Sequence, residues 1–344
     1  MTNAKHNSVK TPFVRLAKRS SIGAVRAWCI RVVAVLLALV INALLIYTIT
    51  KMNPLQVYVS MFKGAFGSTR RIWNFIREGC MLLCISVALA PAFKMRFWNI
   101  GAEGQVLAGG IATAACMIYL GGKLPTPVLF LVMVLASVAA GALWGFIPAL
   151  FKAKWGTNET LFTLMMNYIA IQITSYCVAL WENPYGSNKV GIINPQTKAG
   201  WFPKLFGQQY TWNVLIVLAL TVLVFLYLKF SKQGYEIAVV GESENTARYA
   251  GIKDKRNIVL SMALAGSLAG AAGSLYYLSG NTEFFWSTYQ QLPAVGFNGI
   301  PVALLASNHP IGVIFAGMFM SMLDIAGLQL TNLTAYNEYI TDVI

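Results

Sequence analysis

The sequence predicts an all-α, polytopic helical membrane protein. Of its 344 residues, 57% are hydrophobic and only 11% are charged, whereas a soluble domain carries about 25% charged residues. The hydrophobic residues form long uncharged runs, and a run of about 20 such residues crosses a bilayer as a helix. The charges lie in the gaps between these runs and in the N-terminal tail. We therefore expect about eight to ten transmembrane segments, some of them broken or re-entrant.

The net charge of +14 follows the positive-inside pattern of membrane proteins rather than forming one basic surface. Residues 1–27 contain six basic residues and no acidic one, which predicts a cytoplasmic tail. Residues 28–344 are then a single transmembrane domain that crosses the cell membrane several times. No soluble basic patch with interleaved aromatic residues is present, so we expect no nucleic-acid partner.

The first third of the chain contains two apolar crossings around a mixed segment. Val32–Tyr47 is apolar, and no small-residue cleavage site follows it, so we expect a retained helix rather than a signal peptide. Residues 51–78 mix basic and apolar side chains, which predicts a short interfacial segment. Cys80–Phe93 then crosses the membrane back.

The stretch Phe97–Gln105 places Asn99, Glu103 and Gln105, with two glycines, at the head of an apolar run that continues to Leu120. Polar groups and irregular backbone at membrane depth are tolerated only where they face protein or a water-filled path. Two interpretations follow: a turn at the membrane surface, or a broken helix that lines a translocation route.

Thr160–Trp181 is the next polar-containing crossing, with Asn167 and Gln172 inside the span. Asn158 and Glu159 precede it, and both can cap the start of the helix. The segment 182–210, rich in Asn, Gly and Pro, is the longest predicted external loop, and Trp212–Leu228 returns the chain to the cytoplasm.

Two uncharged runs carry close-packing motifs of the G-x-x-x-G type. One lies at positions 141 and 145, within Leu124–Phe151. The other lies at positions 266 and 270, within Asn257–Thr282.

The run Phe284–Leu323 is interrupted by glycines and prolines, so it is expected to hold two helices, or one helix and a re-entrant piece. Its string Phe297-Asn298-Gly299-Ile300 echoes Phe97-Trp98-Asn99-Ile100-Gly101, as paired broken segments of a repeat-built transporter would. Residues 331–344 predict a loop and the first turn of another helix.

The polar island Lys229–Arg256 separates two apolar runs, and its centre is Gly241–Gly251. Two acidic residues stand near Asn245, a good N-cap, and Gly251 stands where a helix would stop. Acid at the start and base at the end complement the helix dipole. We expect a helix of about two turns to which another protein binds; the alternative is a solvated loop without a role.

Enzymatic chemistry has no support in the sequence. The five cysteines lie in or beside apolar segments without a C-x-x-C spacing, and His6 and His309 have no catalytic neighbourhood. There is no phosphate-binding G-x-x-x-x-G-K-[ST] motif. We therefore expect no catalytic residue, metal site or cofactor in this chain.

Several motifs together resemble the membrane permease subunits of bacterial ABC importers for simple sugars and nucleosides, relatives of the branched-chain amino-acid permeases. They occur in the order of that family. The motifs are Asn99–Gln105, Gly156–Glu159 with Leu164–Ala170, Ala247–Ile252, and Gly296–Ile300 through Pro310–Gly312. The first two are closest to the nucleoside branch. Pro301 and Ala306 depart from the family pattern. The family normally ends with a further helix, of which residues 331–344 would supply only the first turn.

The resemblance implies a type II-like importer permease that pairs with an identical or sister permease. It further implies a cytoplasmic ATPase that holds ATP and Mg²⁺, and an extracellular substrate-binding lipoprotein. Nucleosides are the expected cargo; a ribose- or galactose-type sugar permease and an ion-coupled carrier that uses Glu103 or Glu159 are the alternatives. The implied ATPase-coupling residues are Glu242, Glu244, Asn245, Ala247, Arg248, Tyr249, Ala250 and Gly251. The candidate path residues are Phe97, Asn99, Glu103, Gln105, Asn158, Glu159, Asn167, Phe297 and Asn298.

Overall fold

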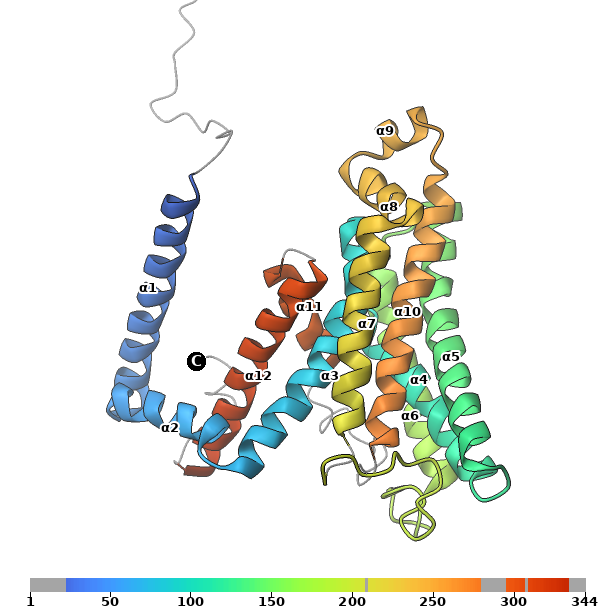
Figure 1. Ribbon diagram of the computed structural model, residues 1–344, viewed down its shortest axis with the longest axis horizontal. Helices are drawn as coiled ribbons and strands as arrows, with labels where there is room; N and C mark the ends of the chain where they lie inside the picture. The colour runs from blue at the N-terminus through green and yellow to red at the C-terminus, as the bar shows by residue number, and fades with distance from the viewer. Residues whose placement is uncertain (1–22, 208–209, 280–294, 307–308, 334–344) are drawn as a thin grey trace, which may run out of the picture.

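The computed structural model describes residues 23–207, 210–279, 295–306 and 309–333 (Figure 1). These parts of the chain are helical and contain no β-strand, which confirms the all-α prediction. Most of the predicted basic tail, the segment 280–294 and residues 334–344 lie outside them. The helices are α1 (Ala24–Thr50), α2 (Pro54–Phe66), α3 (Thr69–Lys94), α4 (Ala102–Leu120), α5 (Thr126–Trp155), α6 (Glu159–Trp181), α7 (Thr211–Phe230), α8 (Lys232–Glu242), α9 (Glu244–Tyr249), α10 (Asp254–Leu278), α11 (Val295–Leu305) and α12 (Pro310–Leu333).

Seven of the described helices are long and apolar enough to cross a membrane: α3, α4, α5, α6, α7, α10 and α12. Shorter apolar stretches lie at Val32–Thr48 in α1 and at Gly296–Leu305 in α11. With the stretch in α1 the described residues reach eight segments, the lower limit of the predicted range of eight to ten.

The loops gather at two ends of the helical bundle (Figure 1). Helices α8 and α9 project from the end where α1 begins, and the loop 182–207 lies at the opposite end. The start of α1 and the polar island thus lie at the same end of the bundle, and which end faces the cytoplasm stays a prediction. Helix α2, inside the segment expected to be interfacial, lies crosswise at the end opposite α8 and α9, between α1 and α3, and packs on α3 and α12.

The two G-x-x-x-G motifs pack against each other, which the sequence did not indicate. Helix α10 lies against both α5 and α4. A Cβ atom added at Gly141 of α5 would lie only 2.7 Å from the Cα of Gly270 on α10. On its other side, Gly273 of α10 approaches the backbone of Gly110 on α4. Small residues thus allow three backbones to meet, as in other membrane bundles.

The described part of the broken apolar run near the C-terminus forms two helices, the short α11 and the long α12. This is the first of the two predicted arrangements. With 11 residues, α11 is about 16 Å long, too short to cross a bilayer. The two echoing strings differ locally, because Phe97–Gly101 is a non-helical connection while Phe297–Ile300 lies within α11; the repeat itself stays a prediction.

Candidate functional site

The connection between α3 and α4 is a buried, non-helical segment. Helix α3 ends at Lys94, Arg96 adopts a left-handed conformation with φ of 60°, and α4 starts at Ala102. Phe97 is 4% exposed and Asn99 is fully buried, whereas Trp98 between them is 47% exposed. This packing against protein favours the broken-helix interpretation over the surface turn, and a role in lining a translocation route stays a prediction.

Amide side chains satisfy the backbone of this segment. The Asn167 Nδ2 group on α6 donates to the carbonyl of Ile100 at 2.9 Å, and its Oδ1 accepts from the Gly104 N–H at 2.8 Å. The Asn99 Nδ2 group donates to Gln105 Oε1 at 3.2 Å. Asn167 lies eight residues into α6, about 12 Å from its start. Irregular backbone at such depth is stable because protein groups, rather than lipid, surround it.

Glu103 joins the start of α4 to the start of α11. Its Oε2 accepts a hydrogen bond from the Gly296 N–H at 2.7 Å, and the residue is only 6% exposed. Gly296 is the second residue of α11, where the helix dipole favours a negative charge. A Cβ at Gly296 would lie 2.5 Å from the Cα of Glu103, so the close approach depends on glycine. Phe297 and Asn298 follow on α11 and are half-buried.

The amide cluster is formed by Asn99, Gln105 and Asn167. The side chains of Asn158 and Glu159 do not take part in it. Asn158 Oδ1 accepts from the Leu161 N–H at 3.2 Å, which confirms its predicted capping role. Glu159 instead pairs with Lys152 Nζ at 2.8 Å, joining the end of α5 to the start of α6. Thr163 connects the start of α6 to the segment 97–101, since its hydroxyl donates to the Glu159 carbonyl and accepts from the Ile100 N–H.

The island Gly241–Gly251 contains the end of α8 and the six-residue helix α9. Its N-cap is Ser243, whose Oγ accepts from the Thr246 N–H at 3.3 Å, so the prediction that Asn245 caps this helix was wrong. Serine and asparagine both cap helices well. The cap is Ser243 because the extended backbone that an N-cap residue adopts is found there. Gly251, with φ of 75°, follows the helix end, as expected.

One of the implied coupling residues, Ala247, does not lie on the surface of α9. Ala247 is fully buried against the rest of the chain, whereas Tyr249 is 97% exposed. Arg248 lies 2.7 Å from Asp254, and this hydrogen bond raises the pKa of Arg248. Ala247 therefore positions the helix and offers no contact surface. The exposed residues of the island are Glu242, Glu244, Asn245, Thr246, Arg248, Tyr249, Ala250 and Gly251.

Helix α8 rests on the end of α3. Gly241 is buried, and a Cβ at this position would lie 3.1 Å from the Cα of Met95. The Lys94 Nζ donates to the Leu228 carbonyl of α7 at 3.1 Å. The projecting helices thus contact the residues that lead directly into the buried segment 97–101.

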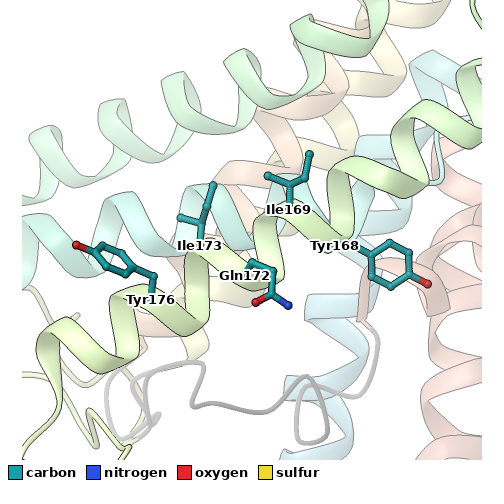
Figure 2. A pocket seen from close by; sticks show the side chains of 5 residues that line it. All are labelled: Tyr168, Ile169, Gln172, Ile173 and Tyr176. Atoms are coloured by element: carbon teal, nitrogen blue, oxygen red, sulfur yellow. The ribbon is translucent and has the colours of Figure 1, made fainter.

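A second feature is an open, shallow surface on one face of α6, formed by Tyr168, Ile169, Gln172, Ile173 and Tyr176 (Figure 2). Among these, the sequence analysis noted only Gln172. The four-residue spacing of positions 168, 172 and 176 was the available signal, because residues four apart share a helix face.

These features define a class of protein: a multi-pass helical membrane protein whose irregular, polar-lined backbone lies at membrane depth, as in transporters. The chain belongs to the family described as the permease component of the branched-chain amino acid transport system, which matches residues 71–344. It is a transmembrane permease subunit, as its relatives are.

Three relatives are similar over most of their length. The nucleoside ABC transporter permease protein NupB of Lactococcus lactis is 32% identical, with 81% of this chain and 78% of NupB covered. The guanosine ABC transporter permease protein NupP of Bacillus subtilis is 29% identical, with 91% and 89% covered. The glucose ABC transporter permease protein TsgB13 of Haloferax volcanii is 27% identical, with 91% and 84% covered.

Proposed function

We propose that this chain is the permease subunit of an ATP-driven importer that carries nucleosides across the bacterial cell membrane. The observation that carries the proposal is its similarity to NupB and NupP, which are named for nucleoside and guanosine transport and match 81% and 91% of this chain. The buried polar groups fit a neutral solute, because the amide cluster of Asn99, Gln105 and Asn167 presents no fixed counter-charge.

Transport is driven by a cytoplasmic ATPase, which binds ATP and Mg²⁺ and docks on the exposed face of α9. In this proposal the N-terminus is cytoplasmic as well. Movement of α8 reaches the membrane interior because Gly241 lies against the last residues of α3. The next residues form the segment held by Asn167, and Glu103 extends the connection to α11. Alternating access then follows from rocking of these helices.

The other partners are a second permease, identical or sister, and an extracellular substrate-binding lipoprotein. The lipoprotein docks at the end of the bundle that carries the loop 182–207, opposite α9. This separation lets the lipoprotein deliver the solute at one end of the bundle while the ATPase acts at the other end.

A simple sugar is the second candidate cargo, favoured by the similarity to the glucose permease of Haloferax volcanii. An ion-coupled carrier has weaker support. Its two candidate ion sites both have structural partners, since Glu159 pairs with Lys152 and Glu103 accepts from Gly296.

Reconstitution tests the proposal. Proteoliposomes with the permease, its ATPase and its binding lipoprotein are expected to accumulate radiolabelled guanosine only when ATP is supplied, whether or not proton and sodium gradients are collapsed. Accumulation driven by an ion gradient without ATP would establish a carrier. ATP-driven accumulation of glucose but not guanosine would establish the sugar permease.

A further inference from the structure

Helix α2 has three sides of different character. One side packs on α3 and α12 and contains the buried Val57. A second side is exposed and apolar, with Leu55, Val59 and Phe62 at 69%, 47% and 62% exposure. These positions are four and three residues apart, so they form one stripe along the helix. The side between these two is polar and exposed, at Gln56. This is the pattern of a helix that lies in the plane of a membrane surface.

The connections of α2 place it at such a surface. Three residues separate it from α1, whose apolar stretch ends at Thr48, and two residues separate it from α3. It lies crosswise at the end of the bundle opposite α8 and α9 (Figure 1). The Tyr58 hydroxyl donates to the Leu39 carbonyl at 2.8 Å, which holds α2 against α1. A helix fixed where an apolar span ends meets the lipid headgroup region along every side that protein does not cover.

Basic side chains stand at both ends of the apolar stripe. Residues 51–77 contain five basic residues and no acidic one. Lys51 precedes the stripe, and Lys63 and Arg70 follow it, and all three are exposed. Arg71 lies beside this second group, because its Nη1 donates to the Lys63 carbonyl at 2.9 Å. Within the described part of the chain, none of these four side chains forms an ion pair.

We propose that α2 is a binding surface for anionic phospholipids, with the acyl chains against the apolar stripe and the headgroups on Lys63, Arg70 and Arg71. Lysine and arginine bind phosphate through charge-assisted hydrogen bonds. Basic segments next to a membrane span are attracted to anionic lipids. In the topology of the proposed function this end is outside, where the positive-inside tendency gives no reason for an excess of basic residues.

A protein partner accounts for this surface less well. A second permease would be expected to pack on α2 through small residues, but Gly64 and Ala65 are already buried in the bundle. A binding lipoprotein approaches from water and gives no reason for the apolar stripe. A phospholipid has both a charged part and an apolar part, so it alone explains why basic residues and the stripe share one helix.

The test is lipid binding by the purified permease in a neutral detergent. Phosphatidylglycerol or phosphatidylcholine is titrated in, and bound lipid is counted by native mass spectrometry. We expect tighter binding of phosphatidylglycerol. The double variant Lys63→Gln/Arg70→Gln should weaken this binding about tenfold or more, because each basic residue near the surface contributes about fivefold. Binding of phosphatidylcholine should not change. Lys63→Arg/Arg70→Lys keeps both charges and should stay within about threefold of wild type.

The matched control is Lys198→Gln/Lys204→Gln. It also removes two exposed lysines at the same end of the bundle, but from the loop 182–207, and should bind phosphatidylglycerol as the wild type does. All three double variants should keep the wild-type melting temperature, because the replaced side chains are exposed. Neither readout uses ATP or a cargo, so the result is independent of the proposed function.

A second measurement identifies what covers the apolar stripe. On a cysteine-free background, spin labels are attached at Val59 or at Gln56 and the permease is placed in phosphatidylglycerol vesicles. The label at Val59 should collide with oxygen, which concentrates in lipid, and the label at Gln56 should collide with a water-soluble nickel chelate.

Three results would overturn the proposal. The first is equal wild-type affinity for the two lipids. The second is a loss of phosphatidylglycerol binding that is the same in the loop control as in Lys63→Gln/Arg70→Gln, since net charge rather than α2 would then decide it. The third is a label at Val59 that neither reagent reaches. A second permease would then cover α2 if the permease alone shows this shielding, and the lipoprotein would cover it if the shielding appears only on its addition.

Discussion

Replacing Tyr249 by alanine tests whether α9 docks into a partner ATPase. Tyr249 is 97% exposed, so its ring adds little to the stability of the permease itself. A docked ring would be largely buried, and an aromatic side chain buries about 150–250 Å². At about 25 cal/mol per Å² this corresponds to roughly 4–6 kcal/mol.

Ordering the side chain and desolvating its hydroxyl reduce this value, and a tyrosine that is a hot spot of an interface contributes about 2–4 kcal/mol. We therefore expect Tyr249→Ala to weaken ATPase binding by about 30-fold or more, with a parallel loss of uptake. The measurement is a titration of the purified permease with its ATPase, alongside ATP-driven uptake.

Two variants complete this experiment. Tyr185→Ala removes an equally exposed tyrosine (94%) from the loop at the opposite end and should leave ATPase binding unchanged. Ala247→Glu buries an unpaired charge inside the chain, which typically costs several kcal/mol, so it should lower the thermal stability of the permease, whereas Tyr249→Ala should not. Wild-type ATPase affinity in Tyr249→Ala would show that α9 is not the docking element.

Three other predictions concern the bundle. Glu103→Ala leaves the buried Gly296 N–H without its acceptor and should lower the free energy of unfolding by about 1–3 kcal/mol. Its melting temperature should therefore be lower than that of Glu103→Gln, whose amide oxygen still accepts. Equal melting temperatures would contradict this prediction. Gly270→Leu should separate α10 from α5 and give aggregated protein by size exclusion, while Leu223→Ala on the exposed face of α7 should stay monodisperse. On a cysteine-free background, a cysteine at Asn188 should be labelled only from outside and one at Lys255 only from inside; the reverse pattern would invert the assigned topology.

The sequence by itself indicated the long apolar helices of this protein, but not α8 or the start of α3 at Thr69. A bilayer accepts about 20 apolar residues with all backbone hydrogen bonds made within the segment, so composition along the chain was enough to place the crossings. The predicted run 160–181 coincides with α6 (Glu159–Trp181), and Asn158 caps it as expected because capping involves residues within one turn. The sequence also singled out Asn99, Glu103, Gln105 and Asn167, since polar groups are rare at membrane depth.

Only the tertiary structure decided what these residues contact. The partner of Glu103 is the backbone N–H of Gly296, 193 residues away, and every residue type except proline offers such a group, so no sequence pattern marks it. The pairing of the two glycine motifs depends on which helices become neighbours. In α9, six residues are too few for a periodicity to show which face is buried, and packing against the rest of the chain put Ala247 inside and Tyr249 outside.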